Sequence, residues 1–226
     1  MDKFIGDTVS ACFGAPRNLP DHEYNGCVAA IRLQEKMAAL RAELGRDSTA
    51  WPELARRLRV RVGVHSGSVL FGDLGAPGHA VFSMLGDNVN LTARLEVAAK
   101  YYSVRILCTA QTKAGCETGR PGRILFRPLD TICVKGRADQ IELHEPMALH
   151  GEATDEIREC VSHFEQGRAR YRQQDWAGAA ELFRNSARLE PANTGSERNP
   201  SIFYLEQIER HLQAPPNLAA NPQSGR

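Results

Sequence analysis

The stretch from Met84 to Glu96, MLGDNVNLTARLE, holds the residues of this sequence best suited to chemistry. Asn90 and Arg94 are four positions apart, so on a helix they project from one face, one turn apart. Gly86-Asp87 ends an apolar run at the point where that helix should begin. An amide and a guanidinium near a helix start suit a polyphosphate or a sugar phosphate. A solvated helix face with an ordinary cap explains the same spacing, so both interpretations stay open from this stretch alone.

Two further segments carry reactive side chains. Asp7 follows Gly6 in KFIGD, where its carboxylate is either a hard oxygen ligand for a metal ion or an ordinary residue of a hairpin turn. His65-Ser66 suggests a nucleophile with its base, but no third group that would orient the histidine is found near it. The glycines between Gly63 and Gly67 favour close strand packing at this point instead.

The elements that must position these residues can be predicted from the hydrophobic pattern. Lys3 to Gly14 predicts two short strands joined by a turn at Gly6-Asp7, and Asp21 is placed to cap a helix that runs to about Leu44. A helix over Asp87 to Tyr101 would place core contacts at Val89, Ala93, Leu95 and Ala98. Over 58–71 the pattern predicts a strand that turns sharply and continues as a second, and further strands are predicted at 80–85, 104–109, 124–134 and 141–146. Because no regular βαβ rhythm appears, the pattern favours an α+β sheet with helices over one face.

The composition changes after about His150. The polar segment from Glu152 to Leu189 is predicted to be helical, and part of it resembles a single tetratricopeptide unit, a helical hairpin of about 34 residues. The resemblance rests on Gly167, Tyr171, Ala180, Phe183 and Pro191. Ile202 to Leu212 predicts one more helix, and the Pro-, Asn- and Ala-rich tail is expected to be disordered. We therefore expect a first domain over residues 1–149, a helical region over 150–212 and a tail over 213–226.

Bulk properties exclude several classes of function. With 28 basic and 27 acidic residues, the net charge of +1 gives no overall electrostatic case for nucleic acid or an anionic membrane. No apolar run approaches the roughly 20 residues of a membrane span. The six cysteines lack zinc-like spacing, so we interpret them as buried thiols in a reducing compartment. No signal peptide pattern opens the chain, and a cytoplasmic location is expected.

Four segments together resemble the class III adenylate and guanylate cyclases. MLGDNVNLTARLE resembles the signature of that family, and KFIGD at Lys3 to Asp7 resembles its metal-binding hairpin. VGVHSGSVLFGDLG at Val62 to Gly75 resembles the Gly-rich strand pair, and VKG at Val134 to Gly136 resembles the late strand end that contacts phosphate. The four segments occur in the order that the family has and cover roughly residues 1–147. The resemblance implies a ferredoxin-like cyclase domain that converts ATP to 3′,5′-cyclic AMP and pyrophosphate in cyclic-nucleotide signalling.

The resemblance also implies a role for each matching residue. Two aspartates of the family hold two Mg²⁺ or Mn²⁺ ions for in-line attack on phosphorus, and Asp7 matches the second of them. Lys3 and Ser83 match the pair that reads the purine, where guanylate cyclases typically place Glu and Cys, so ATP is favoured. Asn90 matches the residue that orients the ribose, and Arg94 matches the one that stabilises charge on the α-phosphate. Lys135 matches the lysine that holds the terminal phosphates.

The chain departs from the family at its start. The first metal aspartate of the family lies in an opening strand with an F-x-D-I pattern, which, with two helices, would precede Lys3. The resemblance therefore predicts a fragment that is inactive alone and has exposed strand edges. Family members are dimers with shared sites, so we expect a homodimer, with Asp7 in one subunit and the other matched residues in its partner. The helical region is expected either to pack on the cyclase domain or to bind a partner protein, and a longer parent is expected to be membrane-anchored. The alternatives are a non-catalytic, cyclase-like dimerisation or interaction module, and a guanylate cyclase.

Overall fold

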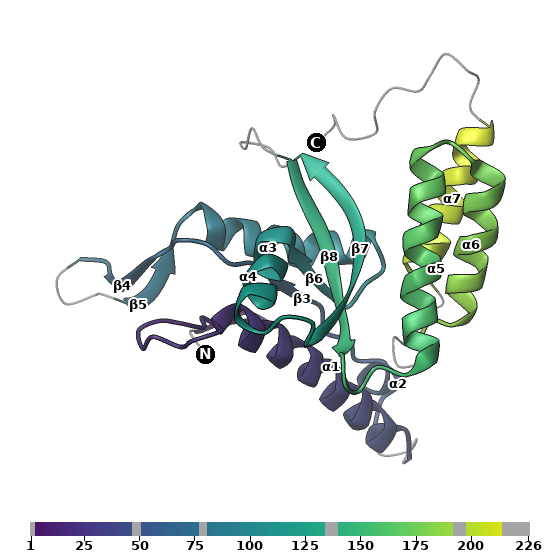
Figure 1. Ribbon diagram of the computed structural model, residues 1–226. Helices are drawn as coiled ribbons and strands as arrows, with labels where there is room; N and C mark the ends of the chain where they lie inside the picture. The colour runs from purple at the N-terminus through teal and green to yellow at the C-terminus, as the bar shows by residue number, and fades with distance from the viewer. Residues whose placement is uncertain (1–2, 47–50, 77–80, 134–139, 192–197, 214–226) are drawn as a thin grey trace.

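The structure is a computed structural model that describes residues 3–46, 51–76, 81–133, 140–191 and 198–213. Figure 1 shows a central sheet with helices around it and a helical bundle, α5 to α7, at one side. No helix within these ranges is long and apolar enough to cross a bilayer. The elements in chain order are β1 (Lys3–Ile5), β2 (Thr8–Ser10), α1 (His22–Arg46), α2 (Glu53–Arg56), β3 (Val62–Val64), β4 (Leu70–Leu74), β5 (Val81–Leu85), α3 (Asp87–Tyr101), β6 (Ile106–Thr109), α4 (Ala110–Gly119), β7 (Ile124–Cys133), β8 (Gln140–Leu149), α5 (Asp155–Arg172), α6 (Trp176–Arg188) and α7 (Pro200–Gln213).

The central sheet has the strand order β3-β6-β8-β7. β3 runs parallel to β6, whereas β6 and β7 each pair with β8 in the antiparallel sense. β7 and β8 form a long hairpin whose register shifts between Leu125 and Phe126 and again between Pro128 and Asp130. Such irregularities bend a strand and increase its twist. Lys135, one of the predicted site residues, lies between these strands and outside the described residues.

Strand β6 is covered on both faces, because each residue from Ile106 to Thr109 is buried. Ile106 and Cys108 belong to a core cluster with α1 and α4, whereas Leu107 belongs to a second cluster with α3 and the C-terminal helices. Successive side chains of a strand point to opposite faces, so helices pack on both sides of the sheet (Figure 1). The prediction of helices over one face is therefore wrong. A strand without polar alternation is typical of a doubly covered position.

Helix α3 has the bounds that the sequence predicts, but its buried stripe is rotated. Leu91, Leu95 and Ala99 are buried, at positions i, i+4 and i+8. Ala93 is exposed and Val89 only half-buried, so these two predicted core contacts are wrong. The apolar residues of α3 are spread around the helix, and the sheet decides which of them it covers.

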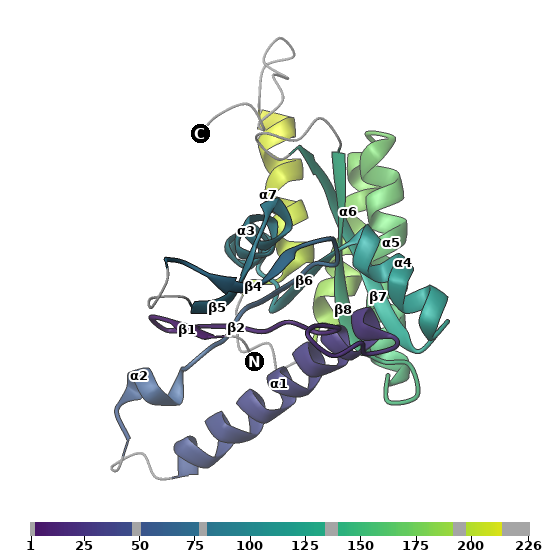
Figure 2. The same cartoon turned by 90° about the vertical axis from the view of Figure 1, so that its left-hand side faces the viewer.

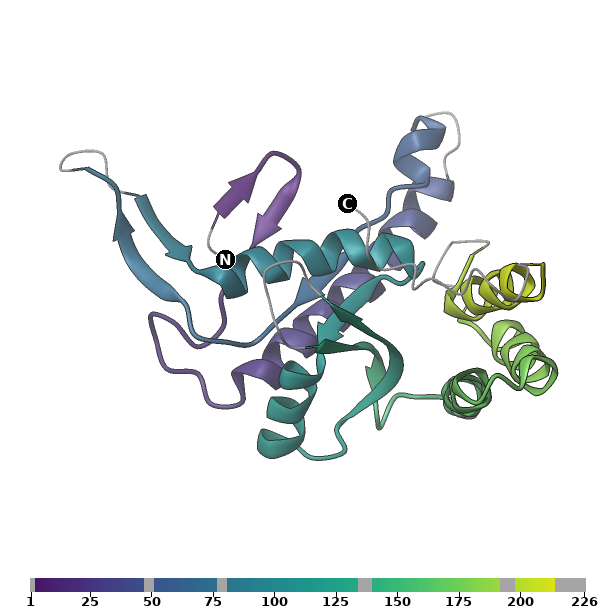
Figure 3. The same ribbon diagram turned by 90° about the horizontal axis from the view of Figure 1, so that it is seen from above.

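Two short ribbons extend from the same side of the central sheet (Figures 1 and 3). β1 and β2 form a sheet of their own, as predicted for this segment, and Gly6 adopts φ +62° in the turn between them. This turn conformation favours glycine. β4 and β5 form the second ribbon. The strand predicted to turn sharply and continue as a second over 58–71 corresponds to the short β3 and to β4, with an irregular stretch between them. Phe4, Ile5 and Val9 are 67%, 58% and 55% exposed, so the first ribbon presents apolar side chains to solvent.

All six cysteines lie in the described residues and are free thiols. The Sγ atoms of Cys27 on α1 and Cys116 on α4 are 3.8 Å apart, in the cluster that joins these helices to β6. Hydrogen bonding with neighbouring thiols, together with burial, raises the pKa of both groups. The prediction of buried thiols holds for four of the six, whereas Cys12 is half-buried and Cys133 exposed.

The C-terminal helices pack closely on one another. Thr154 and Asp175 cap α5 and α6 by accepting hydrogen bonds from the backbone N–H of Ile157 and Gly178. A Cβ atom on Gly167 of α5 would lie 3.0 Å from two ring carbons of Phe183 on α6. Glycine at this position therefore sets the distance between the two helices.

These helices share one core with the central sheet. Leu107, Leu129 and Leu143 of the sheet and Phe164 and Tyr204 of the helices belong to the same buried cluster. The Tyr204 hydroxyl also donates a 2.6 Å hydrogen bond to the Leu129 carbonyl oxygen. The two regions expected on either side of residue 150 are thus held together by continuous apolar packing.

A buried arginine lies at this junction. The Arg127 side chain on β7 has no exposed surface, and its guanidinium donates to Glu145 on β8 at 2.5 and 3.0 Å. It also donates to both carboxylate oxygens of Glu190, just after α6, at 2.7 and 2.8 Å. Its centre lies 5.1 Å from the Phe164 ring centroid on α5. Burial alone would lower the pKa of Arg127, but the two carboxylates outweigh it and raise that pKa. We call Arg127, Glu145 and Glu190 the arginine clamp.

We predict that Arg127→Met lowers the free energy of unfolding by about 3–5 kcal/mol, because it leaves two buried carboxylates without a counter-ion. The triple variant Arg127→Met/Glu145→Gln/Glu190→Gln should recover much of this loss, since it removes the buried charges together. Urea unfolding measures both effects. Arg32→Met is the control, because its pair with Glu152 is exposed and should contribute little. A triple variant no more stable than Arg127→Met would contradict the prediction.

His144 gives the fold a pH dependence. Its side chain on β8 is buried and its Nδ1 atom has no hydrogen-bond partner among the described atoms. Burial, followed by the nearby charge of Lys113, lowers the pKa of His144 to about 4. The folded state therefore binds fewer protons than the unfolded state between pH 6.5 and 4, and stability falls as the pH falls through this window.

We predict that, as the pH falls from 6.5 to 4, the free energy of unfolding of wild type decreases by up to roughly 3 kcal/mol more than that of His144→Gln. Urea unfolding at several pH values measures the two slopes. His150→Gln, a change at an exposed histidine, should keep the wild-type slope. Parallel pH profiles for wild type and His144→Gln would show that His144 does not cause the acid loss.

Candidate functional site

The site is built where β5 runs into α3. Ser83 lies on β5 opposite Gly72 of β4 and is 5% exposed. Gly86 follows the strand with φ +149°, a backbone conformation that other residues rarely adopt, and is the N-cap residue of α3. Its carbonyl oxygen accepts from the backbone N–H of Val89 and Asn90 at 3.1 and 3.4 Å. The glycine lets the chain turn sharply from strand to helix.

Asn90 and Arg94 lie on the first two turns of α3, and both side chains are exposed. They are one turn apart on the helix, so an amide and a guanidinium are presented to solvent together. Ser83, in contrast, is a buried residue of the β4–β5 ribbon. The structure therefore brings these three predicted residues onto one continuous segment, with one of them facing inward.

A hydrogen-bond network fixes the first turn of α3. His65 bonds through Nδ1 to Thr109 Oγ1 at 2.9 Å and through Nε2 to Asn88 Oδ1 at 3.1 Å. The Asn88 amide nitrogen donates to the Ser68 carbonyl oxygen at 2.8 Å. Because Asn88 Oδ1 can only accept, His65 Nε2 carries the proton and Nδ1 accepts from the Thr109 hydroxyl. The network ties α3 to the end of β3 and to Thr109, the N-cap of α4.

Glycines allow this close approach. A Cβ on Gly67 would lie 2.4 Å from the Asn88 amide nitrogen, and one on Gly63 would lie 2.5 Å from the Thr92 carbonyl oxygen of α3. The sequence predicts close strand packing at these glycines, whereas the element that approaches them is helix α3. Both ring nitrogens of His65 are bonded to Thr109 and Asn88. His65 is thus a structural link between elements, and sequence reasoning missed its partner Asn88, whose only signal was its place in GDNVN.

The other predicted residues lie apart from this segment. Asp7 is exposed in the turn of the β1–β2 hairpin, which is a separate sheet from the β4–β5 ribbon (Figure 3). Lys3 begins β1, but its side chain lies outside the described residues, as does all of Lys135. The described part of the chain holds no group of three or more His, Cys, Asp or Glu side chains that could bind a metal ion. Asp7 supplies a single carboxylate, so the described residues do not by themselves fit a metal centre.

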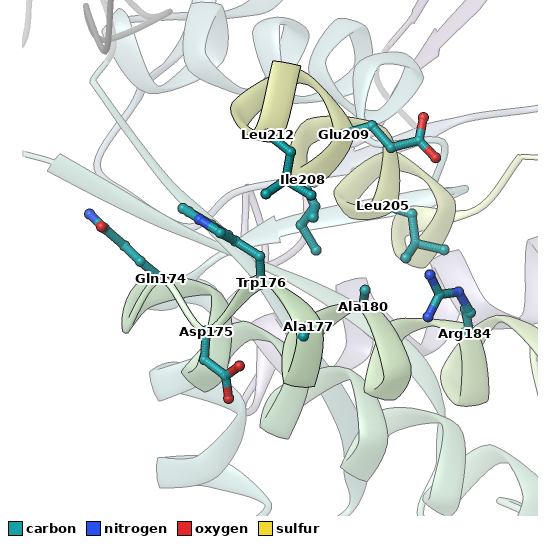
Figure 4. Close-up of a pocket in the computed structure, with 10 residues that line it drawn as sticks. All are labelled: Gln174, Asp175, Trp176, Ala177, Ala180, Arg184, Leu205, Ile208, Glu209 and Leu212. Atoms are coloured by element: carbon teal, nitrogen blue, oxygen red, sulfur yellow. The ribbon is translucent and has the colours of Figure 1, made fainter. Parts of the chain in front are cut away.

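One pocket of the described residues lies elsewhere. It has a volume of about 560 Å³ and lies between α6 and α7, lined by residues such as Trp176, Ile208 and Leu212 (Figure 4). Its walls are largely apolar, with Arg184 and Glu209 at one end. This pocket belongs to the helical bundle and contains none of the predicted site residues.

Comparison with known proteins identifies the family. The model of the adenylate and guanylate cyclase catalytic domain matches residues 3–146. The chain belongs to this family. Adenylate cyclase 1 of Rhizobium meliloti is 30% identical over 143 residues, which are 63% of this chain and 20% of that protein. An adenylate cyclase of Anabaena cylindrica is 29% identical over 153 residues, 66% of this chain and 28% of that protein. This cyclase-family chain therefore matches only a part of these relatives' length.

Solved cyclase structures share the fold. The adenylyl cyclase CyaB from P. aeruginosa superposes with a TM-score of 0.53 and 24% identity, covering 68% of this chain and 74% of that one. The guanylyl cyclase Cya2 gives a TM-score of 0.50 and 23% identity, covering 68% and 72%. At these identities the likeness establishes the mixed α+β cyclase fold, and does not distinguish adenylate from guanylate cyclases.

We predict that Gly67→Ala destabilises the protein by about 1–3 kcal/mol, because the new Cβ collides with the Asn88 side chain. Truncation in the double variant Gly67→Ala/Asn88→Ala should relieve the collision, so the two changes together should destabilise less than their sum. A double-mutant cycle by urea unfolding measures this coupling. Gly151→Ala is the control, since a Cβ there meets no atom within 4 Å. Additive effects would show that the contact is not tight.

Proposed function

We propose that this chain is the catalytic region of an adenylate cyclase, which converts ATP to 3′,5′-cyclic AMP and pyrophosphate in signal transduction. The observation that carries the proposal is the exposed pair Asn90 and Arg94 on the first turns of α3, in a chain of the cyclase family. Asn90 lies in the first turn of α3, where the helix N-terminus favours an anion, and Arg94 adds a cation one turn further along, so both suit the negative charge of a nucleotide phosphate. The adenylate cyclases among the relatives support ATP as the substrate.

In this proposal each residue has a distinct role. Arg94 donates to the α-phosphate and stabilises the charge that develops as the ribose 3′-hydroxyl attacks and pyrophosphate leaves. Asn90 orients the ribose so that this hydroxyl lies in line with the bond that breaks. The His65–Asn88 hydrogen bond holds the first turn of α3, and so fixes the start of the helix that carries both residues.

The choice of base would depend on Lys3 and Ser83. An ammonium facing adenine N1 and a hydroxyl facing the exocyclic amine complement the donor and acceptor pattern of that edge. Ser83 is buried in this chain. For Ser83 to contact the base, the adenine ring must therefore pack directly against β5. This requirement makes the assignment of Ser83 a demanding one. Lys135 is assigned to the terminal phosphates.

The proposal includes a homodimer with shared sites. Asp7 is on a hairpin separate from the β5–α3 segment, and that hairpin exposes Phe4, Ile5 and Val9. An apolar ribbon of this kind favours burial against another surface. A dimer in which Asp7 of one subunit approaches the α3 segment of the other would bring a carboxylate, a potential metal ligand, to the bound triphosphate.

The test uses Arg94→Ala, with Lys100→Ala on the same helix as the matched control. Cyclic AMP formation from ATP is assayed in a form of the chain to which a family-type F-x-D-I strand is added ahead of Lys3, and ATP binding is measured in parallel by equilibrium dialysis. We expect Arg94→Ala to lower kcat roughly a hundredfold to a thousandfold while ATP binding changes little. Lys100→Ala should retain wild-type activity. Absence of cyclic AMP from the intact domain would refute the proposal.

A further inference from the structure

The segment that leads from α2 into β3 exposes large apolar side chains. Trp51 is 50% exposed, Leu54 on α2 is 84% exposed and Leu58 is 48% exposed. Helix α2 lies at the far end of α1, away from the helical bundle (Figure 2) and from the β4–β5 ribbon (Figure 3). Three large apolar residues gathered on one protruding segment are more than the scattered surface leucines of an ordinary protein.

The same segment is strongly basic. Between Trp51 and Arg61 there are four arginines and one glutamate, a net charge of +3 in a chain whose total is +1. An arginine from another element also lies beside this segment: Arg41 of α1 donates to the Leu58 carbonyl oxygen at 3.4 Å. Carboxylates are also present, and Glu53 pairs with Arg57 at 2.7 Å. The net charge of the whole sequence is close to zero, but this segment carries a local excess of positive charge.

The arginines are close enough to affect one another. Burial, followed by repulsion from Arg59, Arg41 and Arg61, lowers the pKa of Arg105 to about 10. Arg61 is held by Glu96 of α3 at 2.8 Å. Several cations that repel one another favour an external anion, which would relieve the repulsion. We call this region the arginine–leucine surface; it comprises Arg41, Trp51, Leu54, Arg57, Leu58, Arg59, Arg61 and Arg105.

We propose that the arginine–leucine surface docks onto a bilayer that contains anionic phospholipids. Arginines at such a surface bind the phosphate and carboxylate headgroups, while tryptophan and leucine enter the boundary between headgroups and acyl chains. Trp51 and Leu54 distinguish this partner from a nucleic acid, because a phosphodiester backbone offers no apolar environment to a leucine that is 84% exposed. The attachment is peripheral, and it does not depend on the proposed cyclase activity.

The test is co-sedimentation of the whole chain with vesicles. Wild type should bind vesicles of phosphatidylcholine and phosphatidylserine in equal parts, should not bind phosphatidylcholine alone, and should dissociate as salt is raised. Arg57→Glu/Arg59→Glu should weaken binding at least about tenfold, since each basic residue near an anionic surface contributes measurably. Trp51→Ala/Leu54→Ala keeps the charge and should also weaken binding. Urea unfolding checks that each variant is folded.

Two further measurements make the result specific. Arg172→Glu/Arg188→Glu carries the same charge change on α5 and α6 and should bind the anionic vesicles like wild type. In a Trp176→Phe background, Trp51 is the one tryptophan left of the two in the sequence, so its emission should shift to the blue on the vesicles. The proposal is overturned if wild type does not bind the anionic vesicles, or if Arg172→Glu/Arg188→Glu loses as much vesicle binding as Arg57→Glu/Arg59→Glu. It is also overturned if the chain binds a DNA duplex tightly and Trp51→Ala/Leu54→Ala leaves that binding unchanged.

Discussion

The arginine clamp is the interaction on which the arrangement of the two halves of this protein depends. Arg127 is a fully buried cation, and it is tolerated because Glu145 comes from the neighbouring strand and Glu190 from the end of α6. An unpaired charge in such a place would be very unfavourable, so sheet and helices must keep their relative positions for the charges to stay compensated. Desolvation also raises the pKa of Glu145 to about 7, although Arg127 opposes that shift. The junction is thus held by apolar packing and made specific by buried charge.

This junction bears on the site through β7 and β8. These strands carry the clamp at their middle and run toward residues 134–139, where the sequence places the lysine assigned to the terminal phosphates. On the opposite edge of the sheet, α3 packs directly on β3 because Gly63 admits its backbone, and His65 then holds its first turn. The exposed amide and guanidinium of the proposed active site therefore stand on a helix that is fixed by backbone contact and by hydrogen bonds. Such rigidity is what preorganised charge stabilisation requires.

Two surfaces extend beyond this fixed frame. The β1–β2 hairpin exposes apolar side chains and carries Asp7, which suits a role between subunits. The arginine–leucine surface at the far end of α1 combines positive charge with tryptophan and leucine. This combination suits the proposed contact with an anionic lipid bilayer, which has charged headgroups over an apolar interior. Overall composition averages these features away, because a net charge of +1 is the sum of local excesses of both signs. Their meaning depends on which residues lie together in space.

The sequence by itself determined the family, the bounds of α3, the β1–β2 hairpin and the spacing of Asn90 and Arg94, because these depend on local pattern and on short motifs. It did not determine which face of α3 is buried. Val89, Ala93 and Leu95 are all apolar and could each be a core residue, and only the position of the sheet decides which of them it covers. Nor did it indicate the clamp, whose members are separated by 18 and 63 positions. An arginine in a sequence is most often solvated, and only the tertiary structure removes Arg127 from water and supplies both carboxylates. The same holds for His65, which became a link between elements once Asn88 and Thr109 were brought to its two nitrogens.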